Sequence, residues 1–122
     1  MFNGLSQPVE LVLVDEGGSS ELDTLLQEVV ELSDQVRYRR APAAEASTYG
    51  LDPDLLPAIA LAGPQGYSRA RFAGAPAGHE FGVLIQDIID LSNEQIELSE
   101  ATKRYLDGLT QDVHLQVFTT PT

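Results

Sequence analysis

The sequence contains no cysteine and no tryptophan, and it has only two histidines among its 122 residues. The absence of cysteine excludes disulfide bonds, thiolate metal sites and cysteine nucleophiles. A serine nucleophile would need a histidine base placed beside it, and nothing in the sequence brings His79 or His114 next to a serine. Nucleophilic catalysis therefore finds little support in this composition.

Basic residues are also scarce, and long apolar runs are absent. Seven Lys and Arg stand against 19 Asp and Glu, which gives a formal net charge of −12. Nucleic-acid binding needs clustered cations, and the same excess of negative charge disfavours an anionic membrane surface. No run approaches the length of about eighteen apolar residues that a membrane span requires, and no basic-then-apolar leader begins the sequence. We expect a cytoplasmic protein that binds neither nucleic acid nor membrane.

The most informative stretch that is present is an apolar run at residues 55–62, closed by Gly63–Gly66. A short apolar run between turn-forming residues is typical of a buried strand. Pro57 lacks a backbone N–H, so it must be the first residue of that strand or lie in the loop before it. Residues 63–66 then turn the chain back into a second strand at Ser68–Phe72.

The elements around this hairpin predict the fold class. We expect strands at Val9–Asp15 and Val36–Arg40, the second at an edge of the sheet, with a helix between them that ends near Ser33. A weak helix at Ala44–Tyr49 precedes the hairpin, and a helix at His79–Leu91 follows it. The first crossover makes its two strands parallel, and the hairpin adds two antiparallel strands. The prediction is an α/β, thioredoxin-like fold with a four-stranded mixed sheet and helices on both faces.

The C-terminal part does not belong to that unit. The pattern predicts a helix at Ser99–Leu109, capped by Ser99, and an alternating strand at Val113–Phe118. A lone helix and strand cannot bury both of their faces. Residues 1–95 are therefore predicted to form one unit, and residues 96–122 the start of a second. The exposed strand is expected to self-associate or to dock on the first unit.

Few residue clusters suggest chemistry. Gly17–Ser20 lies between a strand and a helix start and could bind an anion, but it matches neither common phosphate-binding pattern, and a capped helix start explains it. Asp52 and Asp54 have the spacing of a calcium loop without its other ligands, which favours a solvated acidic loop. His79 is expected to fill a helix-start turn and His114 to lie on the solvent face of its strand. Five arginines on predicted strands are expected to protect sheet edges or to pair with nearby acids: Arg37, Arg39, Arg40, Arg69 and Arg71.

Two segments resemble a known family. Residues 71–81, Arg-Phe-Ala-Gly-Ala-Pro-Ala-Gly-His-Glu-Phe, and residues 88–92, Ile-Ile-Asp-Leu-Ser, closely resemble the glutaredoxin-like protein disulfide oxidoreductases. These proteins are two thioredoxin-fold units in tandem. Residues 111–122 resemble the run that leads into the Cys-x-x-Cys motif of their second unit. The N-terminal domain of the alkyl hydroperoxide reductase flavoprotein subunit shares much of this pattern and ranks second.

The resemblance implies a site that has lost its sulfur chemistry. Pro57 matches the cis-proline that faces the family's redox site, and Leu56 and Pro57 would form a substrate groove. Aligned without gaps from the first helix, the family's first Cys-x-x-Cys falls on Glu16 and Ser19. The chain is therefore predicted to be a redox-inactive unit, without a cofactor, that serves as structural and docking partner for a unit carrying Cys-x-x-Cys or for another redox protein. A homodimer is a further possibility.

Three alternatives stay open at this point. The chain could be a stand-alone module that binds peptides or proteins in the empty groove. It could be the N-terminal domain of a peroxiredoxin-reducing flavoprotein. It could also be an enzyme of another class that binds an anionic ligand at Gly17–Ser20.

Overall fold

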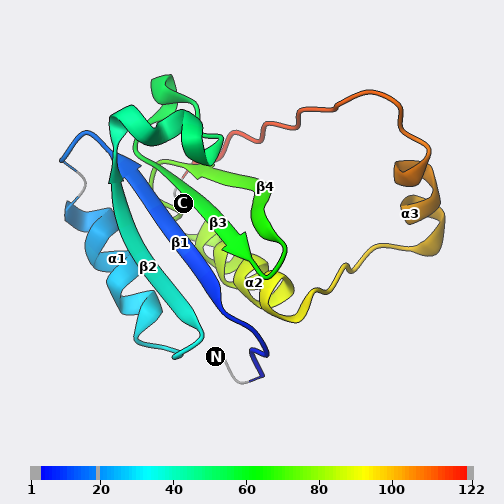
Figure 1. Cartoon of the computed structure of the whole chain (residues 1–122), viewed down its shortest axis with the longest axis horizontal. Coiled ribbons are helices and arrows are strands. Elements are labelled where there is room, and N and C mark those ends of the chain that lie inside the picture. Colours follow the sequence, from blue (N-terminus) through cyan, green and yellow to red (C-terminus); the bar gives the residue numbers. More distant parts are fainter. Residues whose placement is uncertain (1–3, 19, 121–122) are drawn as a thin grey trace.

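The computed structural model describes residues 4–18 and 20–120, which form a sheet with helices packed on it and a segment that loops away from it (Figure 1). The strands are β1 (Val9–Asp15), β2 (Val36–Pro42), β3 (Ala58–Gly63) and β4 (Gly66–Ala73). The α-helices are α1 (Ser20–Val30), α2 (His79–Asn93) and α3 (Glu100–Asp107). Two 3-10 helices precede β3, namely η1 (Ala43–Tyr49) and η2 (Pro53–Leu55).

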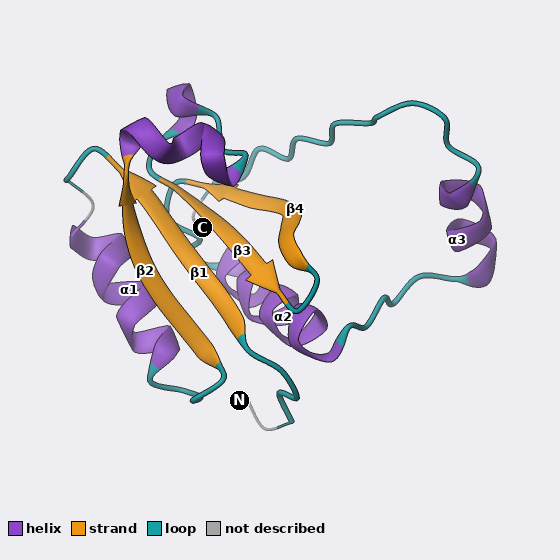
Figure 2. Ribbon diagram, in the orientation of Figure 1, coloured by secondary structure: helices purple, strands orange, loops and turns teal. Residues whose placement is uncertain are grey.

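The four strands form one mixed sheet in the order β2-β1-β3-β4 (Figure 2). β1 runs parallel to β2 and antiparallel to β3, and β3 runs antiparallel to β4. This arrangement confirms the predicted crossover, the hairpin and the edge position of the strand that begins at Val36. It also confirms the predicted α/β class.

β1 is apolar along most of its length because both of its faces are covered. Leu11 and Leu13 belong to the larger core cluster, together with residues of α1 and α2. Val12 and Val14 point to the other face, where they pack with Tyr49 of η1. All four β1 side chains are fully buried. A strand covered on both faces is expected to read as a continuous apolar run, and β1 has the predicted bounds.

Helices cover both faces of the sheet, as predicted, but they are of different types. Both α1 and α2 pack on the same face of the sheet. The opposite face is covered at one end by η1, which occupies the position of the predicted weak helix. Pro42 enters this turn in extended conformation, and Gly50 ends it with a left-handed φ of 70°.

The ends of the α-helices also differ in detail from the prediction. α1 ends at Val30 rather than near Ser33, and α2 extends two residues further than expected. In α3, the predicted cap is confirmed because the Ser99 hydroxyl accepts a hydrogen bond from the Thr102 N–H at 3.2 Å.

The predicted strand at Val113–Phe118 is wrong, since residues 112–120 have no regular secondary structure. Leu115 and Val117 are 86% and 84% exposed. A strand needs a neighbour to pair its backbone groups and a surface to cover its apolar face. In Figure 1 the chain runs away from the sheet through α3 and then returns toward it, where the Thr119 hydroxyl donates to Glu80 at 3.1 Å, but none of the four described strands pairs with this segment.

The chain before β1 is held against the end of α2. Ser92 is fully buried, and its hydroxyl donates to the Gln7 carbonyl at 2.6 Å and accepts from the Gln7 N–H at 3.1 Å. The Ser6 hydroxyl donates to the Ser92 carbonyl at 3.0 Å. These bonds fix α2 beside the start of β1.

Candidate functional site

Two segments that the family resemblance links meet at one end of the sheet. Val14 of β1 pairs with Ala58, the first residue of β3. Asp15, the last residue of β1, therefore lies beside Pro57, which directly precedes β3. The Leu56–Pro57 peptide bond is cis, as the resemblance implied for Pro57. The Gly74 N–H donates to the Pro57 carbonyl at 2.7 Å, which fixes this loop against the end of β4. The β1–α1 loop therefore lies next to a cis-proline.

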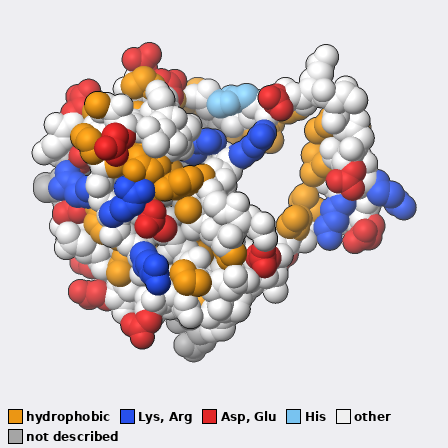
Figure 3. All heavy atoms as spheres, in the orientation of Figure 1, with side chains coloured by type: hydrophobic (Ala, Val, Ile, Leu, Met, Phe, Trp, Pro, Cys, Tyr) orange, Lys and Arg blue, Asp and Glu red, His pale blue; other side chains and the backbone are white. Residues whose placement is uncertain are grey.

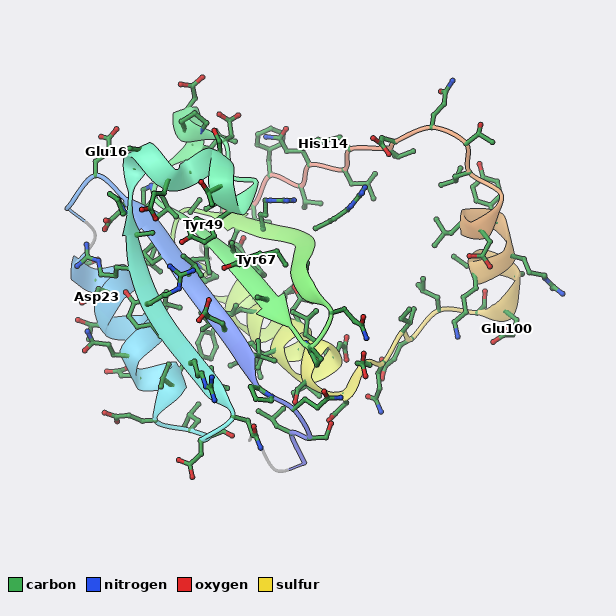
Figure 4. All side chains as sticks on the ribbon, in the orientation of Figure 1. Glu16, Asp23, Tyr49, Tyr67, Glu100 and His114 are labelled. Atoms are coloured by element: carbon green, nitrogen blue, oxygen red, sulfur yellow. The ribbon has the colours of Figure 1, made fainter. Side chains whose placement is uncertain are left out.

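The predicted groove residues are only partly accessible. Leu56 and Pro57 are half-buried, and Leu56 packs against the smaller core cluster, while Leu55 is 44% exposed. Glu16 is exposed in the β1–α1 loop (Figure 4). Ser19, the second position matched to Cys-x-x-Cys, lies outside the described residues. The assignment of Leu56 and Pro57 to a substrate groove stays a prediction, as does the match of Glu16 and Ser19 to the Cys-x-x-Cys positions.

A charged network that the sequence reasoning missed lies beside this loop. Asp15 is buried, and its Oδ2 is 2.6 Å from Nη2 of Arg40. Nη1 of the same arginine is 4.0 Å from Oδ2 of Asp23 in α1, and the Tyr38 hydroxyl donates to Asp23 Oδ1. The alternation of side chains along β2 is a signal that Tyr38 and Arg40 share the face covered by α1. The sequence does not indicate which acidic side chains contact them, because that depends on how α1 packs on the sheet.

The protonation states in this network are well defined. The hydrogen bond to Asp15 raises the pKa of Arg40. Burial, followed by the hydrogen bond to Asp23, raises the pKa of Tyr38. Arg40 therefore stays cationic and Tyr38 stays neutral at physiological pH. The network stabilises the end of β1.

A shallow depression of about 590 Å³ opens over this network. Its lining residues come from the end of β1 and from the end of β2: Asp15, Glu16, Gly17, Arg40, Ala41, Pro42 and Ala43. The surface offers carboxylates and a guanidinium but no thiol, since the sequence has no cysteine. It can make polar contacts with a peptide, but it cannot exchange disulfides.

The anion hypothesis for Gly17–Ser20 gains no support from the geometry. The Gly17 N–H already donates to Asp15 Oδ1 at 3.3 Å. The neighbouring Glu16 carboxylate would repel an anion. The loop is better explained as the connection into α1.

The acidic pair Asp52 and Asp54 has a structural explanation. The Asp52 side chain accepts a hydrogen bond from the Asp54 N–H at 2.9 Å and so caps η2. Within residues 4–18 and 20–120, the structure contains no group of three or more His, Asp or Glu side chains suited to a metal ion.

The two histidines do not reach the loop. His79 is the first residue of α2, as expected, and is exposed. His114 is also exposed, although on no strand, and it lies well apart from Glu16 (Figure 4).

Three of the five arginines on the edge strands, Arg39, Arg40 and Arg69, pair with acids. Nε of Arg39 lies 3.1 Å from Oε1 of Glu10, and Arg40 pairs with Asp15. Arg69 and Asp112 approach to 3.9 Å, but both side chains are almost fully exposed. In water such an exposed pair contributes little to stability.

Comparison with known proteins identifies relatives of the chain. No protein-family model matches the sequence. The chain is 36% identical over 110 residues to the F subunit of Escherichia coli alkyl hydroperoxide reductase, a match that covers 85% of this chain and 19% of the relative. It is 32% identical over 107 residues to the F subunit of Pseudomonas aeruginosa alkyl hydroperoxide reductase, covering 86% of this chain and 19% of the relative. The chain thus spans about a fifth of the length of the curated relatives it matches.

A solved structure supports the fold. The crystal structure of a protein disulfide oxidoreductase from Aeropyrum pernix matches with a TM-score of 0.64 and 21% identity, over 87% of this chain and 49% of that one. At this identity the likeness shows the fold alone. Together the matches confirm the thioredoxin-like fold and the suspected relationship to the F subunit of alkyl hydroperoxide reductase. No helix in the described residues is long and apolar enough to cross a membrane.

Proposed function

We propose that this chain is a redox-inactive thioredoxin-fold unit that acts as the structural and docking partner of a unit carrying Cys-x-x-Cys, in the same chain or in another. The observation that carries the proposal is the position of Pro57 beside the β1–α1 loop, which has Glu16 where the family resemblance places a thiol. Disulfide exchange begins with attack by a thiolate on a disulfide sulfur. A carboxylate cannot form the mixed disulfide, so the unit can bind but not react.

The curated relatives favour one parent over the other. Both are F subunits of alkyl hydroperoxide reductases, whereas the likeness to the disulfide oxidoreductase extends to the fold only. The alternative of a unit from an alkyl hydroperoxide reductase flavoprotein therefore fits better than a disulfide oxidoreductase. In either protein, the partner of this unit would be the domain that supplies the thiols.

Insulin reduction by dithiothreitol tests the inactive state. We expect the chain to leave the rate of insulin precipitation at its uncatalysed value. Acceleration by the purified chain would contradict the proposal, because a chain with no cysteine would then be exchanging disulfides.

A restored motif tests whether the loop is a degenerate redox site. The double variant Glu16→Cys/Ser19→Cys should reduce insulin, because its thiols would sit at the start of α1, where a helix N-terminus stabilises thiolates. Glu21→Cys/Thr24→Cys has the same spacing on α1 and serves as the matched control, which should stay inactive. A folded but inactive Glu16→Cys/Ser19→Cys variant would show that this loop does not retain the geometry of a redox site.

A binding experiment with a thiol-bearing partner distinguishes this proposal from the alternative of a stand-alone binding module. A unit that works with such a partner should bind a separately expressed thioredoxin unit with Cys-x-x-Cys from the same parent protein. A stand-alone module should bind peptides equally well with and without that unit.

A further inference from the structure

The face of the sheet opposite α1 and α2 is only partly covered. η1 packs on one end of it, over the smaller core cluster. The remainder, seen from the η1 side in Figure 3, presents hydrophobic, basic and acidic side chains to solvent. We call this uncovered surface the arginine face and define it by Glu10, Arg37, Arg39, Tyr67 and Arg71.

Strand register places these residues in two rows across the sheet. In the first row, Arg37 of β2 pairs with Glu10 of β1. Glu10 in turn pairs with Ala62 of β3, and Ala62 pairs with Tyr67 of β4. The row thus has a cation at one edge of the sheet and an aromatic ring, 45% exposed, at the other.

The second row has an arginine at each edge. Arg39 of β2 pairs with Val12, which pairs with Ala60 of β3. Ala60 pairs with Arg71 of β4, whose guanidinium lies against Gly50. In this register the strand positions between the two arginines hold only Val12 and Ala60.

Hydrogen bonds hold the Arg39 side chain in place. Arg39 Nη1 donates to the Tyr49 hydroxyl at 2.6 Å and Nη2 donates to the Tyr67 hydroxyl at 3.0 Å, while Nε faces Glu10. The two tyrosine rings meet edge to face with centroids 5.4 Å apart (Figure 4). The hydrogen bond to Tyr49 raises the pKa of Arg39 above its already high ordinary value. The face is therefore preorganised and permanently cationic.

Charge is segregated onto these strands. Five of the seven basic residues of a chain with net charge −12 lie on β2 and β4: Arg37, Arg39, Arg40, Arg69 and Arg71. Arg37 is exposed and makes no ion pair with any residue that the structure describes. Arginine and tyrosine are also the residue types most enriched in protein interfaces.

We propose that the arginine face binds an extended, acidic protein segment. Neighbouring strands lie about 4.8 Å apart, so β2 and β4 are separated by about 14 Å. In an extended peptide with a rise of about 3.3 Å per residue, side chains four positions apart are separated by about 13 Å. Carboxylates at positions i and i+4 can therefore reach an arginine at each edge while the residue between them packs on Tyr67.

The probe for this proposal is the synthetic peptide Thr-Glu-Thr-Tyr-Thr-Glu-Thr, titrated into the isotopically labelled intact chain. We expect shifts of the Arg37 and Arg71 side-chain signals and of Tyr67, and weaker binding as salt rises from about 50 to 200 mM. The same peptide with Gln for both Glu residues should bind at least about tenfold more weakly, as should the variant Arg37→Glu. Arg104→Glu, on α3, removes one exposed cation elsewhere and should leave the affinity unchanged.

Equal losses in Arg37→Glu and Arg104→Glu would overturn the proposal, because attraction by overall charge would then explain binding. Absence of binding, or shifts confined to other surfaces, would overturn it as well. If the chain instead dimerises through this face, with Arg37→Glu giving monomers, the occupant is a second copy and not an acidic segment. Arg71 contacts Gly50, so Arg71→Glu is interpreted only if its melting curve matches that of the parent chain; Arg37→Glu carries the test otherwise.

Discussion

The unit that ends with α2 and the segment that follows it respond differently to similar sequence patterns. Leu11 and Leu13 occupy every second position of β1 and are fully buried. Leu115 and Val117 also occupy every second position of their segment, but they are more than four-fifths exposed. β1 has a strand on each side and helices on its faces, while the later segment has neither. Apolar alternation therefore specifies which surface a strand would bury, but the neighbouring strands decide whether a strand forms.

The most direct test of this difference in packing is to truncate one leucine in each region. Leu61→Ala removes a fully buried side chain of β3 and should lower the free energy of unfolding by about 2–5 kcal/mol. Leu115→Ala removes a side chain that is 86% exposed and should change it by less than about 0.5 kcal/mol. Urea unfolding followed by circular dichroism measures both. Comparable losses would show that the C-terminal segment is packed against the sheet.

Two serines provide a second contrast. Ser92 is buried and bonds both backbone groups of Gln7, so Ser92→Ala should cost about 1–3 kcal/mol of global stability. Ser99 caps the exposed helix α3, and Ser99→Ala should reduce helicity in residues 100–107 without shifting the melting temperature. Thermal melts and amide exchange separate the two outcomes. A large shift in melting temperature for Ser99→Ala would mean that α3 folds cooperatively with the sheet.

A half-buried carboxylate gives a smaller, pH-dependent effect. Burial, followed by repulsion from Asp90, raises the pKa of Asp87 in α2. A carboxyl group whose pKa is higher in the folded state than in the unfolded state destabilises the fold when it is ionised. This penalty grows as pH rises from the unfolded-state pKa to the folded-state pKa, and it is absent at lower pH. Asp87→Asn should therefore raise the melting temperature at pH 7 and lose this advantage below the ordinary range of aspartate. Asp107→Asn on α3 controls for the loss of one negative charge, and an equal gain there would point to net charge alone.

The sequence was sufficient where local pattern and packing agree. β1, the hairpin and α2 were predicted with nearly correct bounds because their apolar residues are buried in the core clusters on the two faces of the sheet. The proposed site at Pro57 required the family resemblance, since no periodicity distinguishes Pro57 from any other strand-entry proline. The Asp15–Arg40–Asp23 network and the rows of the arginine face could not be predicted, because each depends on register or on helix packing between residues far apart in sequence. The strand at 113–118 was wrongly predicted because pattern alone cannot report a missing neighbour.

The smallest expected effect concerns the boundary between the two regions. Gln65 and Gln7 both donate hydrogen bonds to Glu94, and the Gln95 N–H donates to the Asp90 carbonyl, so the end of α2 is bound to the sheet unit through residue 95. Beyond residue 95, every described side chain except Lys103 is exposed, and contacts such as Arg69 with Asp112 and Thr119 with Glu80 are made at the surface. A chain ending at Gln95 should therefore melt within about 1 °C of the longer one, since removing exposed residues costs almost nothing. A chain ending at Asp90 is the matched control; it loses Ser92 and the Glu94 contacts and should melt far lower. If the Gln95 chain were also destabilised, residues 96–122 would contribute to the first unit, and the predicted boundary would be wrong.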